Sequence, residues 1–345
     1  MPAEARATLA KAYADNAVRN AAIRGELLDV HQILAGVQVP HIVLKGWPLV
    51  ERLYTDPAQR FMSDQDFLVP AHRAETGHRA LRAAGLRPLP VKDEWIEKHL
   101  PSLWRNDGYQ WDGYLYDPLY PRPVELHLRL WELGWRGLSV RDLPDVWPLA
   151  VTRVVADQPM QVLSDADTVV HLAMHFAGHL VEREARLNQL LDLARFVAQT
   201  PALDWDLSLR RAEHAGVGRF VYASLYLARE VFGMPLPPPA IWQRLKAQTP
   251  PALAAWLDES GVTDILTSDY RHRAKGQDYR LTFLAAGTVR ERLGIARFAL
   301  VPPLGQLQAK YHVRQAWLGP LLYPRHLAER LRDYGRAFVS NRTRP

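Results

Sequence analysis

The chain has 345 residues, of which 48% are hydrophobic and 23% are charged, with a formal net charge of +6. This composition excludes a disordered chain, and the length allows two packed domains. The absence of cysteine excludes disulfides and thiolate metal sites, so any metal would be bound by Asp, Glu or His. Because no run of eighteen apolar residues and no secretory signal pattern is present, we expect a cytoplasmic protein without membrane partners.

The first 85 residues alternate between helix and strand patterns. A broad apolar stripe, a proline suited to a first helical turn and a glycine at a helix end mark three helices, and two further runs mark strands. In chain order, the predicted elements are helix 3–36, strand 41–44, helix 48–54, strand 60–69 and helix 71–85. This is a mixed pattern of α and β.

Two carboxylates, Asp64 and Asp66, stand one residue apart in the second predicted strand, about twenty residues after a Lys45-Gly46 turn. Because side chains in a strand alternate between its faces, both project to one side, roughly 7 Å apart along the chain. Hard oxygen ligands at this spacing suit Mg²⁺. The pair therefore predicts a site for a divalent cation.

Between residues 91 and 123 the chain is aromatic and rich in turns, and the steps Asp107-Gly108 and Asp112-Gly113 predict hairpins. The aromatic side chains could form a wall on which a base or an acceptor stacks, although such residues more often belong to a core. The next run, 123–130, alternates apolar and polar residues and predicts a strand. We expect Glu125, a third carboxylate, on an exposed face of that strand beside the acidic pair.

From Ser164 onward the pattern becomes helical. Ser164 and Asp167 resemble a capping box, and acidic residues in this first turn favour the helix dipole, so we interpret them as a cap. Apolar residues then recur at helical spacing as far as Phe196. The proline-rich segment 235–239 separates two helical portions, because proline cannot continue a helix interior.

The same region carries a rival constellation, since His171, His175 and His179 are spaced four residues apart and are followed by Glu182. Such spacing can present zinc ligands. Each step of four residues, however, rotates about 40° around a helix, so three imidazoles reach one ion only with help from another element. Packing or hydrogen bonding at a helix interface is the interpretation that we favour for these histidines.

The excess of positive charge lies at the C-terminal end. Residues 301–345 contain eight Lys or Arg residues against Glu329 and Asp333, which equals the net charge of the whole chain. A basic segment with interleaved aromatic residues could hold a polyanion such as RNA. The alternative is the solvated face of a helix, whose apolar spacing is visible in 325–332.

Several of these segments carry a resemblance through their order and spacing. They are Val43-Leu-Lys-Gly46, Arg60, Asp64-Gln-Asp-Phe-Leu-Val69, Val124-Glu-Leu-His127, His171-Leu-Ala-Met-His175 and Leu191-Asp-Leu193. The series resembles the uncharacterised nucleotidyltransferase family of bacteria, within the polymerase-β-like superfamily, over residues 20–200. The resemblance implies a small mixed β-sheet flanked by helices, three acids that bind Mg²⁺, and transfer of a nucleotidyl group from an NTP.

Two departures from the superfamily pattern limit what can be carried over. The usual Gly-Ser turn before the acidic pair is here Lys45-Gly46, so phosphate handling cannot be copied from other members of the superfamily. Gln65 stands where an apolar residue is expected between the acids. It could weaken the packing of the strand, or it could place an amide near the nucleotide.

The chemistry of the implied reaction assigns roles to the acids. Attack of a hydroxyl on the α-phosphorus of an NTP requires stabilisation of an entering oxygen and a departing pyrophosphate, which two metal ions can provide. In this interpretation Asp64 and Asp66 bridge the metals. Glu125 binds the metal that activates the acceptor hydroxyl and could act as the base.

The remaining candidates would bind the nucleotide. Lys45, the backbone amide of Gly46 and Arg60 would engage the triphosphate through charge and oriented N–H groups. Lys45 could instead extend along an apolar strand end, and Arg60 could pair with Asp64. His127 shares the face of Glu125 and either orients it or is a solvated imidazole.

We therefore expect an α+β protein with a nucleotidyltransferase-like catalytic domain at 1–160 and a mainly helical domain with a basic tail at 161–345. The expected reaction uses an NTP and Mg²⁺, with Mn²⁺ as an alternative, and a small molecule, peptide, protein or RNA as acceptor. A catalytically silent nucleotide- or RNA-binding protein of the same fold is the main alternative, against which the presence of all three acids argues. A helical metal-binding module centred on the histidines is another.

Overall fold

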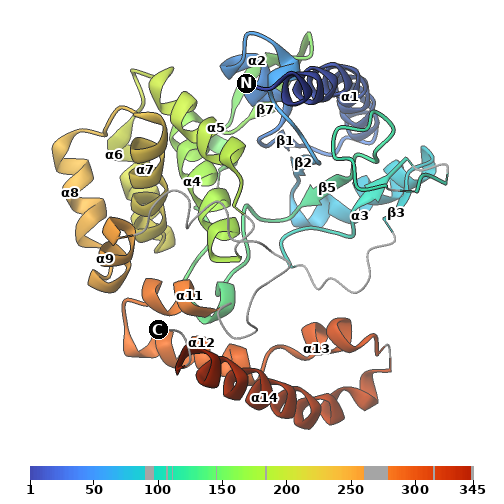
Figure 1. Cartoon of the computed structure of the whole chain (residues 1–345). Coiled ribbons are helices and arrows are strands. Elements are labelled where there is room, and N and C mark those ends of the chain that lie inside the picture. The colour runs from blue at the N-terminus through green and yellow to red at the C-terminus, as the bar shows by residue number, and fades with distance from the viewer. Residues whose placement is uncertain are drawn as a thin grey trace. The chain divides into compact units, whose positions relative to one another are not determined.

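The computed structural model describes residues 1–89, 97–105, 108–110, 112–144, 146–182, 185–259, 279–313 and 315–342. By its internal contacts the chain divides into two units (Figure 1). The sheet unit contains the described residues of 1–89, 97–130 and 146–168, and the helical unit contains 131–144 and the described residues from 169 onward. The predicted division at residue 160 stays a prediction about domains, while the contacts show that both units are built from separated stretches of chain.

The sheet unit is organised around a mixed seven-stranded sheet in the order β3-β4-β5-β2-β1-β7-β6. Its strands are β1 (Ile42–Val43), β2 (Gln65–Leu68), β3 (Arg87–Pro88), β4 (Leu103–Trp104), β5 (Val124–His127), β6 (Val151–Val155) and β7 (Gln158–Val162). At the centre, β2 pairs antiparallel with β1 and parallel with β5, and β1 pairs parallel with β7. The prediction of an α+β fold with a mixed sheet is confirmed.

Three helices accompany this sheet, namely α1 (Ala3–Gly36), α2 (Trp47–Leu53) and α3 (Ala71–Ala83), with short 3₁₀ turns η1 (Pro57–Gln59) and η3 (Trp147–Leu149). They confirm the helices predicted from the sequence to within one or two residues. Buried side chains of α1 and α3 share one apolar core with Phe67 of β2 and Leu126 of β5. Because neighbouring residues of a strand point to opposite faces, Asp66, Glu125 and His127 lie on the other face of the sheet.

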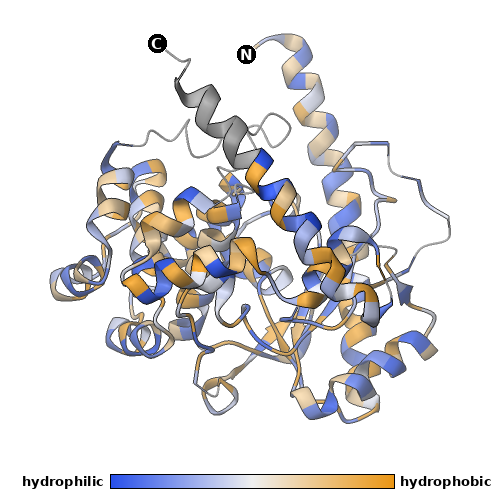
Figure 2. Cartoon of the chain, turned by 90° about the horizontal axis from the view of Figure 1, so that it is seen from below, coloured by the Kyte–Doolittle hydropathy of each residue, from blue (hydrophilic) through white to orange (hydrophobic). Residues whose placement is uncertain are grey.

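Helix α1 also holds the segment that precedes the acidic pair. Residues 3–15 are exposed or half-buried, and in Figure 2 the N-terminal end of the helix projects from the rest of the sheet unit. Further along, the buried side chains of Asn16 and Asn20 donate to the carbonyl of Arg60 at 3.2 and 2.9 Å. Arg19 Nε donates to the carbonyl of Met62 at 3.3 Å. These bonds anchor the irregular backbone that leads into β2 on a rigid helix.

The helical unit confirms the prediction of helices after Ser164. Its elements are α4 (Asp165–Glu182), which begins in the sheet unit, η2 (Trp135–Gly137), α5 (Leu187–Ala198), α6 (Trp205–Ala215), α7 (Gly218–Phe232), α8 (Pro239–Ala247), α9 (Pro251–Glu259), α11 (Arg280–Ala285), α12 (Val289–Leu300), α13 (Leu304–Tyr311), η6 (Ala316–Leu321) and α14 (Leu322–Arg342). The proline-rich segment separates α7 from α8, as predicted. At the start of α4, Asp167 N donates to Ser164 Oγ at 3.1 Å, which confirms the predicted cap. None of the described helices has the combination of length and apolarity that a bilayer crossing requires.

The prediction of a hairpin at Asp112-Gly113 was wrong. Among the described residues between β4 and β5 there is no strand next to Asp112-Gly113, so this step is not a hairpin. Instead, the Asp112 side chain accepts from Tyr114 N at 2.8 Å, and Gly113 takes a φ of 99°. An aspartate that bonds its own backbone forms a turn without needing paired strands. Asp107, in the other predicted hairpin, lies outside the described residues.

The expected exposure of Glu125 was also wrong. Strand β5 lies inside the sheet, between β4 and β2, and its polar face is largely covered. The side chain of Glu125 is only 17% exposed and that of His127 only 4%. An alternating sequence pattern distinguishes the two faces of a strand, but it does not reveal what lies over the polar one.

Candidate active site

Three of the candidate residues meet on one face of the central strands. In the parallel pairing of β2 with β5, Asp66 lies opposite Glu125, and Leu68 lies opposite His127. Partners in such a register point to the same face, so Asp66, Glu125 and His127 are brought together by the sheet itself. On the other side of β2, Leu44 N donates to the carbonyl of Asp66 at 3.0 Å, which places the end of β1 beside this acid.

The imidazole of His127 stands between the two carboxylates. Its Nε2 atom lies 2.9 Å from Asp66 Oδ1 and 3.3 Å from Glu125 Oε2. Within the part of the chain that the structure describes, these residues are the one group of three His, Asp or Glu whose ligand atoms all lie within 4.8 Å of one another. Cis ligands of a divalent cation with bonds of roughly 2.1 Å are roughly 3 Å apart, so the donor set fits such an ion.

Lys45 and Asp64 complete the cluster from its edge. Lys45 Nζ donates to Asp66 Oδ2 and lies 3.6 Å from Asp64 Oδ1. The Asp64 side chain directly precedes β2 and is 33% exposed, whereas that of Asp66 is 3% exposed. The predicted strand 60–69 is therefore shorter than expected, and Asp64 occupies the rim of the site rather than its floor.

Burial works against every charge in this cluster, and neighbouring groups decide the outcome. For Asp64, burial raises the pKa, repulsion by Asp66 and Glu125 adds to this effect, and Lys45 only partly offsets it. Burial alone would also raise the pKa of Asp66, but Lys45 and the hydrogen bond with His127 hold that pKa well below its ordinary value. Asp66 is therefore the ionised centre of the site.

Glu125 and His127 stabilise each other's charged forms. Burial would raise the pKa of Glu125, but the hydrogen bond with His127 and the charges of His99 and His127 together outweigh it, and the pKa is lowered. Burial would lower the pKa of His127, and its hydrogen bonds with Asp66 and Glu125 reverse this effect and raise the pKa. The site thus gathers three carboxylates around a lysine and a histidine that are held positive.

Two residues that the sequence analysis did not identify also touch Glu125. Ser102 Oγ donates to Glu125 Oε1 at 3.1 Å, and His99 Nε2 lies 3.3 Å from Glu125 Oε2. Both come from a segment that runs antiparallel to β5, with Leu100 N donating to the carbonyl of Leu126 at 3.0 Å. No local signal marks these residues, because only the pairing of distant segments brings them to the acid.

The predicted phosphate-binding residues occupy two places. Gly46 takes a φ of 75°, which glycine adopts without strain, and precedes α2 directly after Lys45. Arg60 is buried, at 7% exposure, and follows η1, where its carbonyl accepts from Asn16 and Asn20 of α1. Lys45 is therefore in the acidic cluster and Gly46 adjoins it, while contact of Lys45, Gly46 and Arg60 with phosphate stays a prediction.

Gln65, which departs from the superfamily pattern, points to the opposite face of β2 from Asp66. Its Nε2 atom donates to Glu26 Oε2 of α1 at 3.2 Å, and the same carboxylate receives two hydrogen bonds from Arg122, at 2.7 and 2.8 Å. Gln65 therefore joins a polar layer between the sheet and α1. This contact does not place its amide near the acidic cluster.

The three histidines of α4 lie in a different environment. Their rings follow one another along the helix, with centroid separations of 6.3 Å between His171 and His175 and 4.7 Å between His175 and His179. His175 Nε2 lies 3.3 Å from Gln189 Nε2 of α5. As far as the chain is described, they do not join a further ligand into a compact group of three, and His175 lies at a helix interface.

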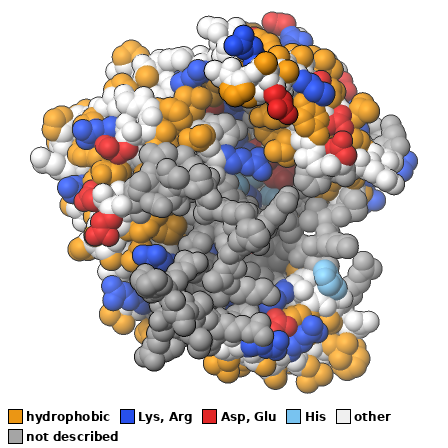
Figure 3. Space-filling view, viewed as in Figure 1, with side chains coloured by type: hydrophobic (Ala, Val, Ile, Leu, Met, Phe, Trp, Pro, Cys, Tyr) orange, Lys and Arg blue, Asp and Glu red, His pale blue; other side chains and the backbone are white. Residues whose placement is uncertain are grey.

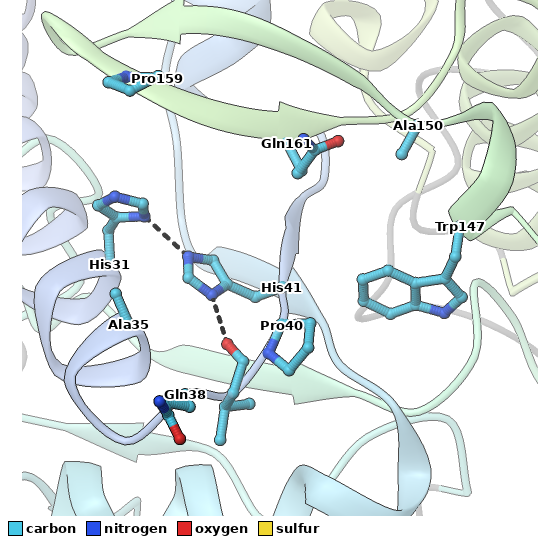
Figure 4. Close-up of a pocket in the computed structure, with 10 residues that line it drawn as sticks. His31, Ala35, Gln38, Pro40, His41, Trp147, Ala150, Pro159 and Gln161 are labelled. Atoms are coloured by element: carbon cyan, nitrogen blue, oxygen red, sulfur yellow. Dashed lines mark hydrogen bonds between the residues drawn. The ribbon is translucent and has the colours of Figure 1, made fainter.

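A separate pocket opens on the α1 side of the sheet unit, with a volume of about 670 Å³ (Figure 4). Within it, His31 Nδ1 lies 2.8 Å from His41 Nε2, and His41 Nδ1 lies 2.9 Å from the carbonyl of Val39. Trp147 and Gln161 complete its wall. Since none of the described residues that line this pocket is acidic, it does not resemble a cation site.

Comparison with known proteins identifies the family of this chain. A family model described as uncharacterised nucleotidyltransferase matches residues 1–233. A solution structure of the antibiotic-resistance factor ANT(2'')-Ia is similar with a TM-score of 0.38 and 12% identity, over 61% of this chain and 98% of that one, a likeness too low to bear on function. No curated protein matches. Since the family model spans more than half of the chain and includes every residue of the acidic cluster, the chain belongs to the uncharacterised nucleotidyltransferase family.

Proposed function

We propose that this nucleotidyltransferase moves an NMP group from an NTP to a hydroxyl of an acceptor, with a divalent cation, Mg²⁺ or Mn²⁺, held by Asp64, Asp66 and Glu125. The observation that carries the proposal is the convergence of Asp66 and Glu125 on one sheet face, with Asp64 at the rim. A compact cluster of acids on rigid strands offers the oxygen ligands that such ions take. Family membership supplies the reaction class.

In the proposed step, the acceptor oxygen forms a bond to the α-phosphorus while the bond from that phosphorus to pyrophosphate breaks. The pyrophosphate leaves with the electron pair, and the proton of the hydroxyl passes to the carboxylate of Glu125. Glu125 suits this task because its lowered pKa keeps it ionised and because Ser102 and His99 orient its two oxygens. A bound cation supplies stabilisation of the charge on the entering and leaving oxygens.

Lys45 has two roles in this proposal. Without a nucleotide, its ammonium group offsets the acids by contact with Asp66 and Asp64. With an NTP bound, we propose that Lys45, the backbone of Gly46 and Arg60 contact the triphosphate. The positive φ of Gly46 supports this, because a residue without Cβ lets a phosphate approach the backbone closely.

For the acceptor we propose a hydroxyl of a small molecule, peptide or protein rather than RNA. Two basic side chains of the C-terminal region, those of Lys310 and Arg325, form ion pairs with Glu329 at 2.9 and 3.4 Å. Figure 3 shows basic side chains beside an acidic one on the surface over α13 and α14. Part of the positive charge is thus compensated within the helical unit, which weakens the argument for a polyanion.

The proposal is tested by incubating the full-length protein with each α-labelled NTP, Mg²⁺ or Mn²⁺, and separate small-molecule, protein and RNA fractions of a cell extract. We expect metal-dependent release of pyrophosphate and transfer of label to one fraction. Asp64→Ala and Asp66→Ala should abolish transfer. Asp29→Ala, which removes a half-exposed acid of α1 in the same unit, should leave it unchanged.

Two other outcomes would change the function assigned to this protein. Nucleotide binding without transfer to any fraction, indifferent to metal and to the two aspartate changes, would favour a silent nucleotide-binding protein and sink the proposal. Transfer to the RNA fraction would retain the reaction and correct the acceptor.

A further inference from the structure

The position of His127 suggests more than a hydrogen bond to the acids. The two oxygens of Asp66 face different partners, since Oδ2 accepts from Lys45 and Oδ1 faces His127 Nε2 at 2.9 Å. The nearest oxygen of Glu125, Oε2, faces the same nitrogen at 3.3 Å. Two oxygens and one nitrogen therefore converge on a common point, and Lys45 lies outside this set of three atoms.

The orientation of the ring is set from its other side. His127 Nδ1 lies 3.3 Å from the carbonyl of Arg129, an acceptor that calls for an N–H at Nδ1. Metal-binding histidines almost always donate their second ring nitrogen in this way, which leaves the other nitrogen as the one that binds the ion. Without an ion, Nε2 donates to the two carboxylates. When an ion takes the place of that proton, Nε2 offers a lone pair beside the two carboxylate oxygens, and all three atoms can bind the ion.

His99, which pairs with His127 across neighbouring segments, also faces a backbone carbonyl with Nδ1 and a carboxylate with Nε2. Its Nδ1 lies 2.6 Å from the carbonyl of Leu100, and its Nε2 faces Glu125 Oε2. His99 is not a member of the compact group of three, so it acts on Glu125 and not as a ligand. It is a positioning residue that directs the carboxylate towards His127.

Burial makes water a poor substitute for a protein ligand here. The side chains of His127 and Asp66 are only 4% and 3% exposed. An ion at the point where they converge would take its ligands directly from these atoms. Mg²⁺ prefers an oxygen octahedron and gives up its water reluctantly, whereas first-row transition ions accept imidazole nitrogen readily.

We propose that the cation site of this chain is a mixed oxygen and nitrogen site, in which His127 Nε2 binds the ion together with Asp66 and Glu125, and that it therefore favours a transition ion such as Mn²⁺ over Mg²⁺. This inference rests on the proposed function, because it concerns the same site. It adds a nitrogen ligand and an order of ion preference to the three acids. It also gives His127 a role that a solvated or merely orienting imidazole does not have.

The test uses the full-length protein freed of metal and loaded with Mn²⁺ or Mg²⁺ alone. Calorimetry measures the affinity for each ion, and pulsed EPR of the Mn²⁺ form reports ¹⁴N coupled to the metal. The variants are His127→Gln and His99→Gln, with His72→Gln, an exposed histidine of α3, as the matched control. Asp66→Asn reports whether the acidic cluster binds the ion at all.

We expect ¹⁴N coupling in the wild type, in His72→Gln and in His99→Gln, and its loss in His127→Gln. His127→Gln should weaken Mn²⁺ binding about tenfold or more while changing Mg²⁺ binding much less, so that the preference between the ions falls. His99→Gln should weaken both ions by a similar factor, about tenfold, because it acts through Glu125.

The inference is overturned if Mn²⁺ binds in a manner that depends on Asp66 but shows no ¹⁴N coupling, or if His127→Gln weakens both ions equally. Those results leave the proposed function standing with an all-oxygen site. If Asp66→Asn has no effect on ion binding, the proposed site itself fails. The spectrum of the wild type decides the question of the nitrogen ligand even if a variant does not fold.

Discussion

Two buried groups of charges, one in each unit, show how differently a fold can treat a carboxylate. The acidic cluster of the sheet unit holds Asp64, Asp66 and Glu125 around Lys45 and His127. The helical unit holds Glu291, at the start of α12, against Arg219 of α7. Asp66 and His127 in the first group are buried, and so are Glu291 and Arg219 in the second. Their hydrogen bonds distinguish a group whose charges are fully paired from one in which the acids outnumber their partners.

Every acceptor position of Glu291 is used. Oε1 receives Arg219 NH2 at 2.6 Å and the backbone N of Ser139 at 2.9 Å, while Oε2 receives Arg219 NH1 at 3.0 Å and the backbone N of Gly287 at 2.8 Å. One negative charge meets one positive charge in a bidentate pair. The group ties three separate segments of the helical unit together and leaves neither oxygen of Glu291 for a ligand.

The acidic cluster is not balanced in this way. Three carboxylates repel one another, and the pKa of Asp64 is raised by burial and by that repulsion. A cation would relieve the excess of negative charge. The comparison teaches that an imbalance of buried charge, and not burial of charge as such, distinguishes the candidate site from the structural ion pair in this chain.

The largest effect should come from Glu291→Gln. This change leaves Arg219 buried without its counter-charge, so the free energy of unfolding should fall by about 3–5 kcal/mol. Urea denaturation measures it. In Glu329→Gln, which removes the acid of an ion pair near the surface, the change should stay within about 1 kcal/mol. Equal effects in the two variants would show that Glu291 is no more structural than a surface acid.

The same pair predicts a dependence on pH. Burial would raise the pKa of Glu291, but Arg219 and the backbone N–H groups outweigh it and the pKa is lowered. Its stabilising contribution is therefore complete above the ordinary glutamate value, about 4.3, and is lost as the pH falls through the value in the folded protein. The stability gap between wild type and Glu291→Gln should shrink from pH 7 towards pH 3. A gap that stays constant over this range would contradict the assignment.

In the acidic cluster, removal of a charge should act in the opposite direction. Because the pKa of Asp64 is raised, its ionised form costs stability at neutral pH, and Asp64→Asn should increase the free energy of unfolding by about 1 kcal/mol. Thermal and urea unfolding measure the gain, and Asp29→Asn, at a half-exposed acid of the same unit, serves as the control. A loss of stability in Asp64→Asn would mean that the cluster is structural and would erase the contrast with Glu291.

The smallest effect should come from Ser102→Ala. Ser102 orients one oxygen of Glu125 without supplying charge, and His99 and His127 still contact the other oxygen in the variant, so turnover should fall by only about threefold. Steady-state kinetics with the acceptor fraction measures it. A fall as large as that caused by loss of an acid would make Ser102 part of the chemistry instead of a support for it.

Part of the site could be found in the sequence because it depends on local periodicity. The Lys45-Gly46 turn and the spacing of Asp64 and Asp66 are visible in a few neighbouring residues, and the alternation that puts Glu125 and His127 on one strand face follows from the geometry of a single strand. The helices of both units follow in the same way from apolar spacing and from caps such as Ser164 with Asp167.

The errors share one physical cause, which is that pairing and burial involve segments far apart in the chain. Asp112-Gly113 carries a hairpin signal, but a turn needs neighbouring strands to become a hairpin. Glu125 was predicted to be exposed because the alternating pattern of its strand contains no information about the elements that cover the sheet. His99 and Ser102 were missed because they reach Glu125 only through the antiparallel pairing of their segment with β5.

The sequence by itself determined the helices, the central strands and the identity of the acids, since each depends on the positions of residues a few places apart. Tertiary structure alone decided which of these residues meet. The parallel register of β2 and β5 joins Asp66 to Glu125 and His127, and it leaves Asp64 at the rim. That register depends on the pairing of chain segments 59 residues apart, which the burial of a shared core can enforce and a local pattern cannot.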